Sequence, residues 1–291
     1  MSLSFEREGR FWPHREHGRF VSTERLRFFG LQVGHGPDLV LLHGVGGSTH
    51  CWAPLIPLLA RDWRVTALDL PGHGFTELPD DERLTPEGMR DDLVLALRAF
   101  DCAPQVFIGH SAGAALALLL AVDGSTPRPD RPTPRTLLGV NPSLVPPDRM
   151  PMPGWLEALA RPFVRAGAFA QFWSRMGRNP RMLGRILAST GSQVTPSQQR
   201  CYGAIASTPD RVHAALTMMV QWNEEALTSR FASVSQHVER HVLMAGRRDR
   251  WIPAQAVRRV AQRIPQAHVI EFDAGHLGPE ENPSAILAEL N

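Results

Sequence analysis

One serine of this sequence stands in a context typical of an enzymatic nucleophile. Ser111 lies in the segment GHSAG at 109–113, which fits the pattern G-x-S-x-G. The apolar segment before it, 105–110, predicts a strand, and the apolar segment after it, 112–122, predicts a helix. In a strand–turn–helix of this kind, a strained turn lifts the serine hydroxyl clear of the sheet. The sequence therefore predicts that Ser111 is a nucleophile rather than a serine in an ordinary tight turn.

A serine hydroxyl needs a base that takes its proton and an acid that orients the base. His276 is the predicted base because it follows the last predicted strand, 268–273. Asp249 is the predicted acid because it follows the preceding strand, 241–246, so both lie at the carboxyl edge of the sheet. Two alternatives remain for the acid: Asp249 pairs with a neighbouring arginine on a solvated loop, or Asp273 takes its role.

A glycine-rich segment, HGVGG at 43–47, follows the apolar strand segment 38–43. Glycines at this place let a carbonyl oxygen of a substrate approach the backbone closely. The N–H groups of Val45 and Ala112 are the predicted donors to a developing oxyanion. The other reading, a phosphate-binding loop, is disfavoured because G-x-x-x-x-G-K-[ST] is absent and the sequence contains no lysine.

Strands and helices alternate along the segments that must position these residues. The predicted strands are 26–33, 38–43, 64–69, 105–110, 136–141, 241–246 and 268–273. The predicted helices between and after them are 85–100, 112–122, 253–264 and 283–290. This alternation predicts the α/β class, with a mostly parallel central sheet and helices on both faces. The N-terminal stretch 7–27 is interpreted as a tail packed on this domain, with a membrane-touching arm as the alternative.

The alternation breaks between Pro142 and Arg230, where prolines separate short helical patterns such as 154–165 and 210–226. We predict an inserted helical cap at residues 142–230, between core segments 1–141 and 231–291.

This predicted cap is rich in methionine and aromatic residues, which suit apolar ligands. We predict substrate contacts from Trp173, Met218, Met219 and Trp222. The alternative is that these side chains pack in the core.

Composition excludes several classes of protein. The 31 basic and 29 acidic residues give a net charge of +2, which argues against a nucleic-acid binder. The longest apolar run, 112–122, is too short to span a membrane, and residues 1–21 do not form a signal peptide. Three widely spaced cysteines without a CxxC pattern indicate neither a disulfide framework nor a zinc site. We therefore expect a cytoplasmic protein whose triad requires no metal or cofactor.

The motifs together resemble those of the α/β-hydrolase superfamily. HGVGG at 43–47, DLPGHG at 69–74, GHSAG at 109–113, Asp249 and GH at 275–276 occur in the expected order. A narrower resemblance is to the magnesium-chelatase accessory proteins of bacteriochlorophyll biosynthesis. It is carried by core segments such as WPHREHGRFV at 12–21 and by segments of the predicted cap, among them NPSLVPP at 141–147, STGSQVTP at 189–196 and ALTMMVQWN at 215–223.

The resemblance implies an α/β-hydrolase fold with a serine hydrolase activity on an ester or thioester. It also implies a functional link to magnesium chelatase, with a small ester, a thioester or a tetrapyrrole as the substrate. Two alternatives stay open. The chain is a non-catalytic tetrapyrrole-binding accessory or chaperone protein, or it is a cofactor-free haloperoxidase-like protein or generic carboxylesterase.

Overall fold

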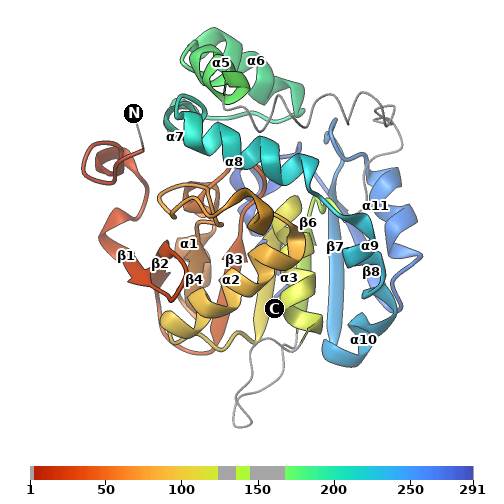
Figure 1. Cartoon of the computed structure of the whole chain (residues 1–291). Helices are drawn as coiled ribbons and strands as arrows, with labels where there is room; N and C mark the ends of the chain where they lie inside the picture. Colours follow the sequence, from red (N-terminus) through yellow and green to blue (C-terminus); the bar gives the residue numbers. More distant parts are fainter. Residues whose placement is uncertain (1–2, 124–135, 145–167, 291) are drawn as a thin grey trace.

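A single eight-stranded sheet organises the chain in the computed structural model, which describes residues 3–123, 136–144 and 168–290 (Figure 1). The strands are β1 (Gly18–Ser22), β2 (Arg27–Val33), β3 (Asp38–Leu42), β4 (Arg64–Leu68), β5 (Val106–His110), β6 (Thr136–Val140), β7 (Arg240–Gly246) and β8 (Ala267–Phe272). Their order is β1-β2-β4-β3-β5-β6-β7-β8. The β1–β2 and β2–β4 pairs are antiparallel, and every other pair is parallel. The predicted, mostly parallel sheet is confirmed.

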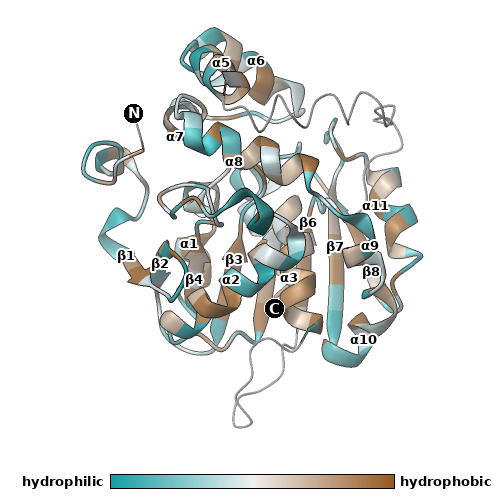
Figure 2. Cartoon of the chain, in the orientation of Figure 1, coloured by the Kyte–Doolittle hydropathy of each residue, from teal (hydrophilic) through white to brown (hydrophobic). Residues whose placement is uncertain are grey.

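Both faces of the sheet are apolar. Neighbouring residues of a strand point to opposite sides, so a strand with consecutive hydrophobic residues contributes to the core on both faces. On β3, Val40 and Leu42 join one hydrophobic cluster, whereas Leu39 and Leu41 join the other. The first cluster includes residues of α2 (Pro86–Ala99), α3 (Ala112–Val122), α10 (Val234–His237) and α11 (Ala254–Ala261). The second includes residues of α1 (Ile56–Leu59), of the short 3-10 helix η3 (Thr49–Trp52) and of α13 (Pro283–Ala288). Figure 2 shows α3 as hydrophobic along its length, in keeping with its burial beside the sheet.

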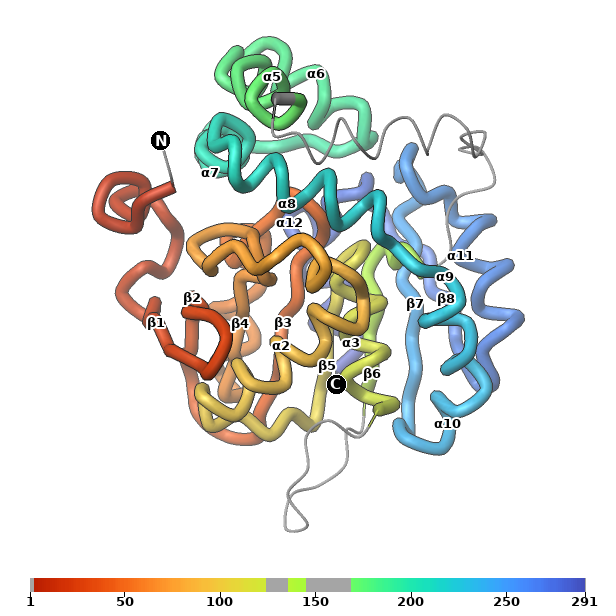
Figure 3. The backbone as a smooth tube through the Cα atoms, in the orientation of Figure 1, coloured from red at the N-terminus to blue at the C-terminus, as the bar shows by residue number. Residues whose placement is uncertain are grey.

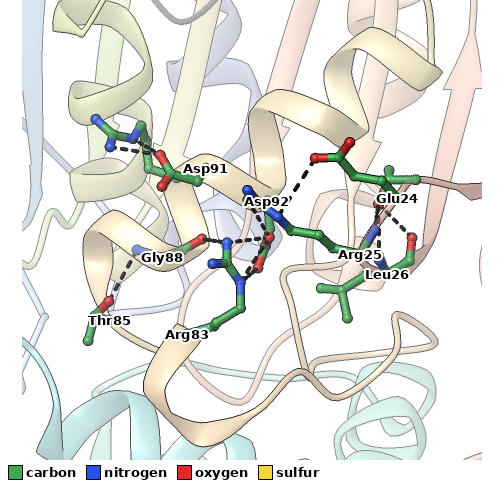
Figure 4. Close-up of polar contacts among 10 residues, drawn as sticks. Glu24, Arg25, Leu26, Arg83, Thr85, Gly88, Asp91 and Asp92 are labelled. Atoms are coloured by element: carbon green, nitrogen blue, oxygen red, sulfur yellow. Dashed lines mark hydrogen bonds and ion pairs between the residues drawn. The ribbon is translucent and has the colours of Figure 1, made fainter.

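Helix α2 is attached to its surroundings by a buried carboxylate. Thr85 caps the helix by accepting a hydrogen bond from the Gly88 N–H at 3.1 Å. The fully buried side chain of Asp92 accepts hydrogen bonds from the Arg83 guanidinium, and Arg25 lies 3.5 Å away (Figure 4). These contacts tie the helix to two segments that precede it in the chain.

Between β6 and β7 the described chain contains helices and no strand. The first five of these described helices are α5 (Ala168–Gly177), α6 (Pro180–Ser189), α7 (Pro196–Ala206), α8 (Pro209–Val220) and α9 (Glu224–Thr228), and the short 3-10 helix η5 (Phe231–Ser233) and α10 follow before β7. Figure 3 shows that α5 to α8 lie beyond one edge of the sheet and that the chain returns through α9 to β7. Four of these first five helices, α6 to α9, begin at or just after a proline or an N-capping asparagine, which satisfies or removes N–H groups left free at a helix start.

The structure differs from the expected elements in two places. The N-terminal stretch contributes the edge strand β1, which pairs with β2 from Gly18 opposite Leu31 to Ser22 opposite Arg27. The predicted helix 210–226 is two helices, because Asn223 accepts a hydrogen bond from the Glu225 N–H and starts α9. The predicted helix 154–165 lies outside the described residues. Among those described, no helix is long and apolar enough to cross a membrane.

Candidate active site

The turn between β5 and α3 holds Ser111 in a backbone conformation that side chains rarely adopt. Its φ is 53° and its ψ is −120°. Its N–H donates to the Val140 carbonyl at 3.0 Å, and its carbonyl accepts from the Ser143 N–H at 3.0 Å, so the end of β6 and the residues directly after it hold the turn. A Cβ atom at Gly113 would lie 2.1 Å from the Leu42 carbonyl oxygen. The glycine therefore lets α3 start directly against β3.

His276 and Asp249 are in direct contact. The Nδ1 atom of His276 lies 2.8 Å from Oδ2 of Asp249, and both side chains are almost completely buried. The other carboxylate oxygen accepts the backbone N–H groups of Trp251 and Ile252, each at 2.8 Å. Donation from Nδ1–H leaves Nε2 of the neutral imidazole as the proton acceptor. The pair can therefore orient a base.

The alternative acid, Asp273, occupies a different environment. Its side chain is 74% exposed and forms an ion pair with Arg248 at 3.0 Å. Asp249, in contrast, binds His276 and the backbone N–H groups of Trp251 and Ile252. It forms no hydrogen bond with the described arginines of its own loop. Of the two carboxylates weighed from the sequence, Asp249 is the one beside the imidazole.

Asn141 also holds this pair, and sequence reasoning did not single it out. Its amide nitrogen lies 2.8 Å from Oδ2 of Asp249 and 2.6 Å from the Gly275 carbonyl. Its side-chain oxygen accepts the Gly246 N–H at 3.1 Å. The available signal was its place directly after β6, at the same edge of the sheet as Asp249 and His276.

Two further groups fix the backbone of His276. Its carbonyl oxygen lies 2.7 Å from Nε2 of His110, and its N–H donates to the Thr190 carbonyl at 3.2 Å. Burial lowers the pKa of His110 to about 3, so this imidazole stays neutral and serves as a hydrogen-bond donor. Trp251 completes the surroundings, with its ring centroid 5.3 Å from that of His276.

A cavity of about 290 Å³ opens where the helices after β6 meet the sheet. Ser111, His276 and Val45 line it together, although they are far apart in the sequence. Most other lining residues are apolar, including Trp173, Leu183, Ile186, Leu187, Ile205 and Leu216. Such a cavity suits an apolar ligand with a few polar groups that orient it.

The two residues with the predicted oxyanion donors differ in their position relative to this cavity. Val45 lies on its wall, whereas Ala112 is buried directly behind Ser111 at the start of α3. Neither backbone N–H donates a hydrogen bond to another residue in the described part of the chain. The first N–H groups of a helix are free in any case and carry its positive dipole end.

The four residues predicted to touch a substrate mostly lie away from this cavity. Trp173 lines the cavity, but Met218, Met219 and Trp222 do not. Met218 is fully buried in a hydrophobic cluster that Trp222 packs against, and Met219 is 59% exposed. The structure therefore does not place these three residues on the cavity wall, and substrate contact through them stays a prediction. The face of α8 that meets the cavity carries Arg211, Val212 and Ala215 instead.

Beside the cavity, a buried polar cluster joins η3 to α7 and to α12 (Gly278–Glu281). The Tyr202 hydroxyl donates to Oε1 of Glu280 at 2.5 Å and lies 3.4 Å from Sγ of Cys51. His50, Cys51 and Glu280 also offer donor atoms within 4.8 Å of one another, so they are the described residues that could hold a metal ion. Burial raises the pKa of Glu280 to about 8 and raises that of Cys51 strongly, so both side chains are neutral near pH 7.

A mostly parallel sheet with a serine on a strained turn and a buried histidine–aspartate pair at its carboxyl edge defines a class of hydrolase folds. The family model described as "Alpha/beta hydrolase family" matches residues 39–290. The chain belongs to this family, as the motifs predicted.

Sequence relatives extend over nearly the whole chain. It is 32% identical over 273 residues to a protein of Rhodobacter capsulatus named "Magnesium-chelatase 30 kDa subunit", covering 91% of this chain and 90% of the relative. It is 30% identical over 258 residues to a "Pimeloyl-[acyl-carrier protein] methyl ester esterase" of Xanthomonas axonopodis, covering 85% and 90% of the two chains. The predicted likeness to magnesium-chelatase proteins is thus confirmed at the level of sequence.

Solved structures share the fold. A crystal structure of an alpha/beta hydrolase fold protein from Burkholderia ambifaria superposes with a TM-score of 0.65 and 24% identity, covering 94% of this chain and 99% of that one. The predicted fold class is confirmed.

Proposed function

We propose that the protein is a serine hydrolase of carboxylic esters or thioesters, with Ser111, His276 and Asp249 as its catalytic triad. One observation carries the proposal. Ser111 and His276 line the same cavity, and His276 donates from Nδ1 to the buried carboxylate of Asp249 at 2.8 Å. Membership of a family with esterase relatives supports it.

The residues divide the reaction between them. The Ser111 hydroxyl oxygen attacks the carbonyl carbon while Nε2 of His276 takes its proton. The N–H groups of Val45 and Ala112 stabilise the oxyanion of the tetrahedral intermediate. When that intermediate collapses, the imidazolium protonates the departing alcohol or thiol. A water molecule then attacks the acyl-enzyme with the same histidine as its base, which releases the acid and restores the serine.

Labelling and turnover test the proposal together. We expect a fluorophosphonate probe to label the wild-type protein once, at Ser111, and we expect hydrolysis of p-nitrophenyl esters of short acids. Ser111→Ala removes the nucleophile, so labelling disappears and kcat falls at least about a thousandfold.

The matched control is Ser143→Ala, because Ser143 donates its backbone N–H to the carbonyl of Ser111 and this donor survives the substitution. This variant keeps labelling and turnover. Folded wild-type protein that resists the probe and hydrolyses none of the esters would refute the hydrolase proposal.

The cellular role we propose is a step that accompanies magnesium insertion in bacteriochlorophyll biosynthesis. It rests on the relative named as a magnesium-chelatase subunit. We further place the protein in the cytoplasm, in keeping with three free cysteines that are all buried.

A second candidate is a tetrapyrrole-binding accessory protein for that chelatase. The exposed aromatic side chains beside the cavity favour it: Trp173 is 37% and Trp251 is 47% exposed, and both line the cavity. Absorbance titration of the Ser111→Ala protein with protoporphyrin IX separates the candidates. Saturable binding without any wild-type esterase activity favours this second role, and the absence of binding eliminates it.

A further inference from the structure

Arg211 of α8 is an unusual residue on the cavity wall. Its residue exposure is only 7%, and it lines the same cavity as Ser111 and His276. Among the described residues that line the cavity, it is the only one with an arginine, lysine, aspartate or glutamate side chain. Arg211 therefore brings a permanent positive charge to the wall of a cavity whose other lining residues are mostly apolar.

The guanidinium of Arg211 is only partly satisfied. One terminal nitrogen, Nη1, donates to the Thr76 carbonyl at 2.6 Å. Its Nε–H is buried and has no hydrogen-bond partner in the described part of the chain. No aspartate or glutamate of that part lies within the 4.0 Å that defines an ion pair with it.

Two acidic residues interact with Arg211 from a distance, but neither forms an ion pair with it. Burial lowers the pKa of Arg211, and the negative charges of Asp210 and Asp69 partly oppose this shift. Asp210 is exposed. The two carboxylate oxygens of Asp69 accept the N–H groups of Thr49 and Phe75, each at 2.7 Å. Asp69 is therefore engaged in holding its own loop.

A buried cation is stable when an anion pairs with it and its donors are filled. A carboxylate matches the planar fork of a guanidinium and accepts from two of its N–H groups at once. We propose that Arg211 binds a carboxylate of the substrate inside the cavity. The substrate then carries two functions: the ester that Ser111 attacks and a free acid that pairs with Arg211.

This inference rests on the proposed hydrolase activity and names its substrate class. That class is the half-esters of dicarboxylic acids, with an apolar segment between the two ends that contacts the walls. A merely structural Arg211, holding Thr76 in place, would treat charged and neutral substrates alike.

The test compares matched pairs of substrates. Mono-p-nitrophenyl glutarate, adipate and suberate are paired with the p-nitrophenyl esters of pentanoic, hexanoic and octanoic acid. We expect the wild-type kcat/KM to be about ten- to a hundredfold higher for the half-ester in at least one pair, as for a hydrogen bond to a charged group. Arg211→Met should reduce kcat/KM for that half-ester at least tenfold more than for its neutral partner.

Two further variants make the comparison sharp. Arg211→Lys keeps the charge without the fork and should retain part of the preference. Arg185→Met, an exposed arginine of α6 that does not line the cavity, should leave both substrates unchanged. Circular dichroism and melting temperature verify that each variant is folded.

Failure of this inference differs from failure of the hydrolase proposal. If wild-type protein hydrolyses the neutral esters but prefers no half-ester, or if Arg211→Met keeps the full preference, the carboxylate site is refuted and the hydrolase stands. If Arg211→Met does not fold, two measurements on the wild-type protein take its place: the preference for the half-ester and competitive inhibition by free adipate. A half-ester preference together with inhibition by adipate supports the site, and the absence of these two effects overturns it. If neither ester type reacts and the probe fails, the proposed function itself falls.

Discussion

At the scale of single residues, the candidate site depends on how firmly its imidazole is held. Asp249 accepts Nδ1–H of His276 with one oxygen and two backbone N–H groups with the other. Asn141 reaches both the carboxylate and the loop that carries the histidine. Because the carboxylate has no freedom to rotate, the histidine keeps the tautomer that accepts a proton at Nε2.

Asp249→Asn tests this role. An amide in place of the carboxylate offers an N–H to Nδ1, which favours the wrong tautomer, so we expect kcat to fall about a thousand- to ten-thousandfold. Stopped assays of ester hydrolysis measure the loss. Asp273→Asn is the matched control because that side chain is exposed and paired with Arg248. Equal activity of Asp249→Asn and the wild type would remove Asp249 from the triad.

At the scale of elements, most of the sheet and its covering helices could be predicted from local patterns. Helix α3 follows the expected bounds, Ala112–Val122, and seven of the eight strands lie within a residue or two of the predicted segments. Strand β1 was missed because its sequence, GRFVS, has no apolar run, and at the sheet edge its residues are exposed or only half-buried. Its pairing depends on β2 and not on its own composition.

Helix α2 offers a test of how one element is anchored. Asp92→Asn keeps one acceptor oxygen but removes the buried negative charge that pairs with the guanidinium of Arg83, and we expect the free energy of unfolding to fall by about 1–3 kcal/mol. Urea unfolding followed by circular dichroism measures it. The neighbouring control is Asp91→Asn, whose side chain is 47% exposed, with an expected change within about 0.5 kcal/mol. Similar losses in both variants would contradict a special role for Asp92.

At the scale of the whole molecule, the helices after β6 are joined to the rest of the chain by polar contacts as well as by packing. Tyr202 of α7 donates to Glu280 of α12, and the Thr190 carbonyl accepts the N–H of His276. The chain that covers the cavity therefore touches the candidate catalytic loop directly. A change in this contact should influence both stability and the site.

Glu280 makes that contact sensitive to pH. Its pKa is about 8 in the folded protein against an ordinary value of 4.5, so above pH 4.5 the unfolded chain releases a proton that the folded chain keeps. We expect the free energy of unfolding of the wild type to decrease, relative to Glu280→Gln, as pH rises from about 4.5 to about 8.

Urea titrations of both proteins at several pH values in this window measure the difference. Glu225→Gln, at an exposed position, serves as the control and should follow the wild type. Parallel curves for the wild type and Glu280→Gln would mean that Glu280 is ionised in the folded state.

The sequence by itself determined the class of fold and the identity of the candidate triad, because these depend on local apolar patterns, on the turn around Ser111 and on the order of the loops that carry Asp249 and His276. Only the tertiary structure decided which residues face the cavity. A helix such as α8 has several apolar sides, and its packing buried Met218 in a hydrophobic cluster and placed Arg211 on the cavity wall. That choice is made by the fit of distant surfaces, which no local pattern of residues records.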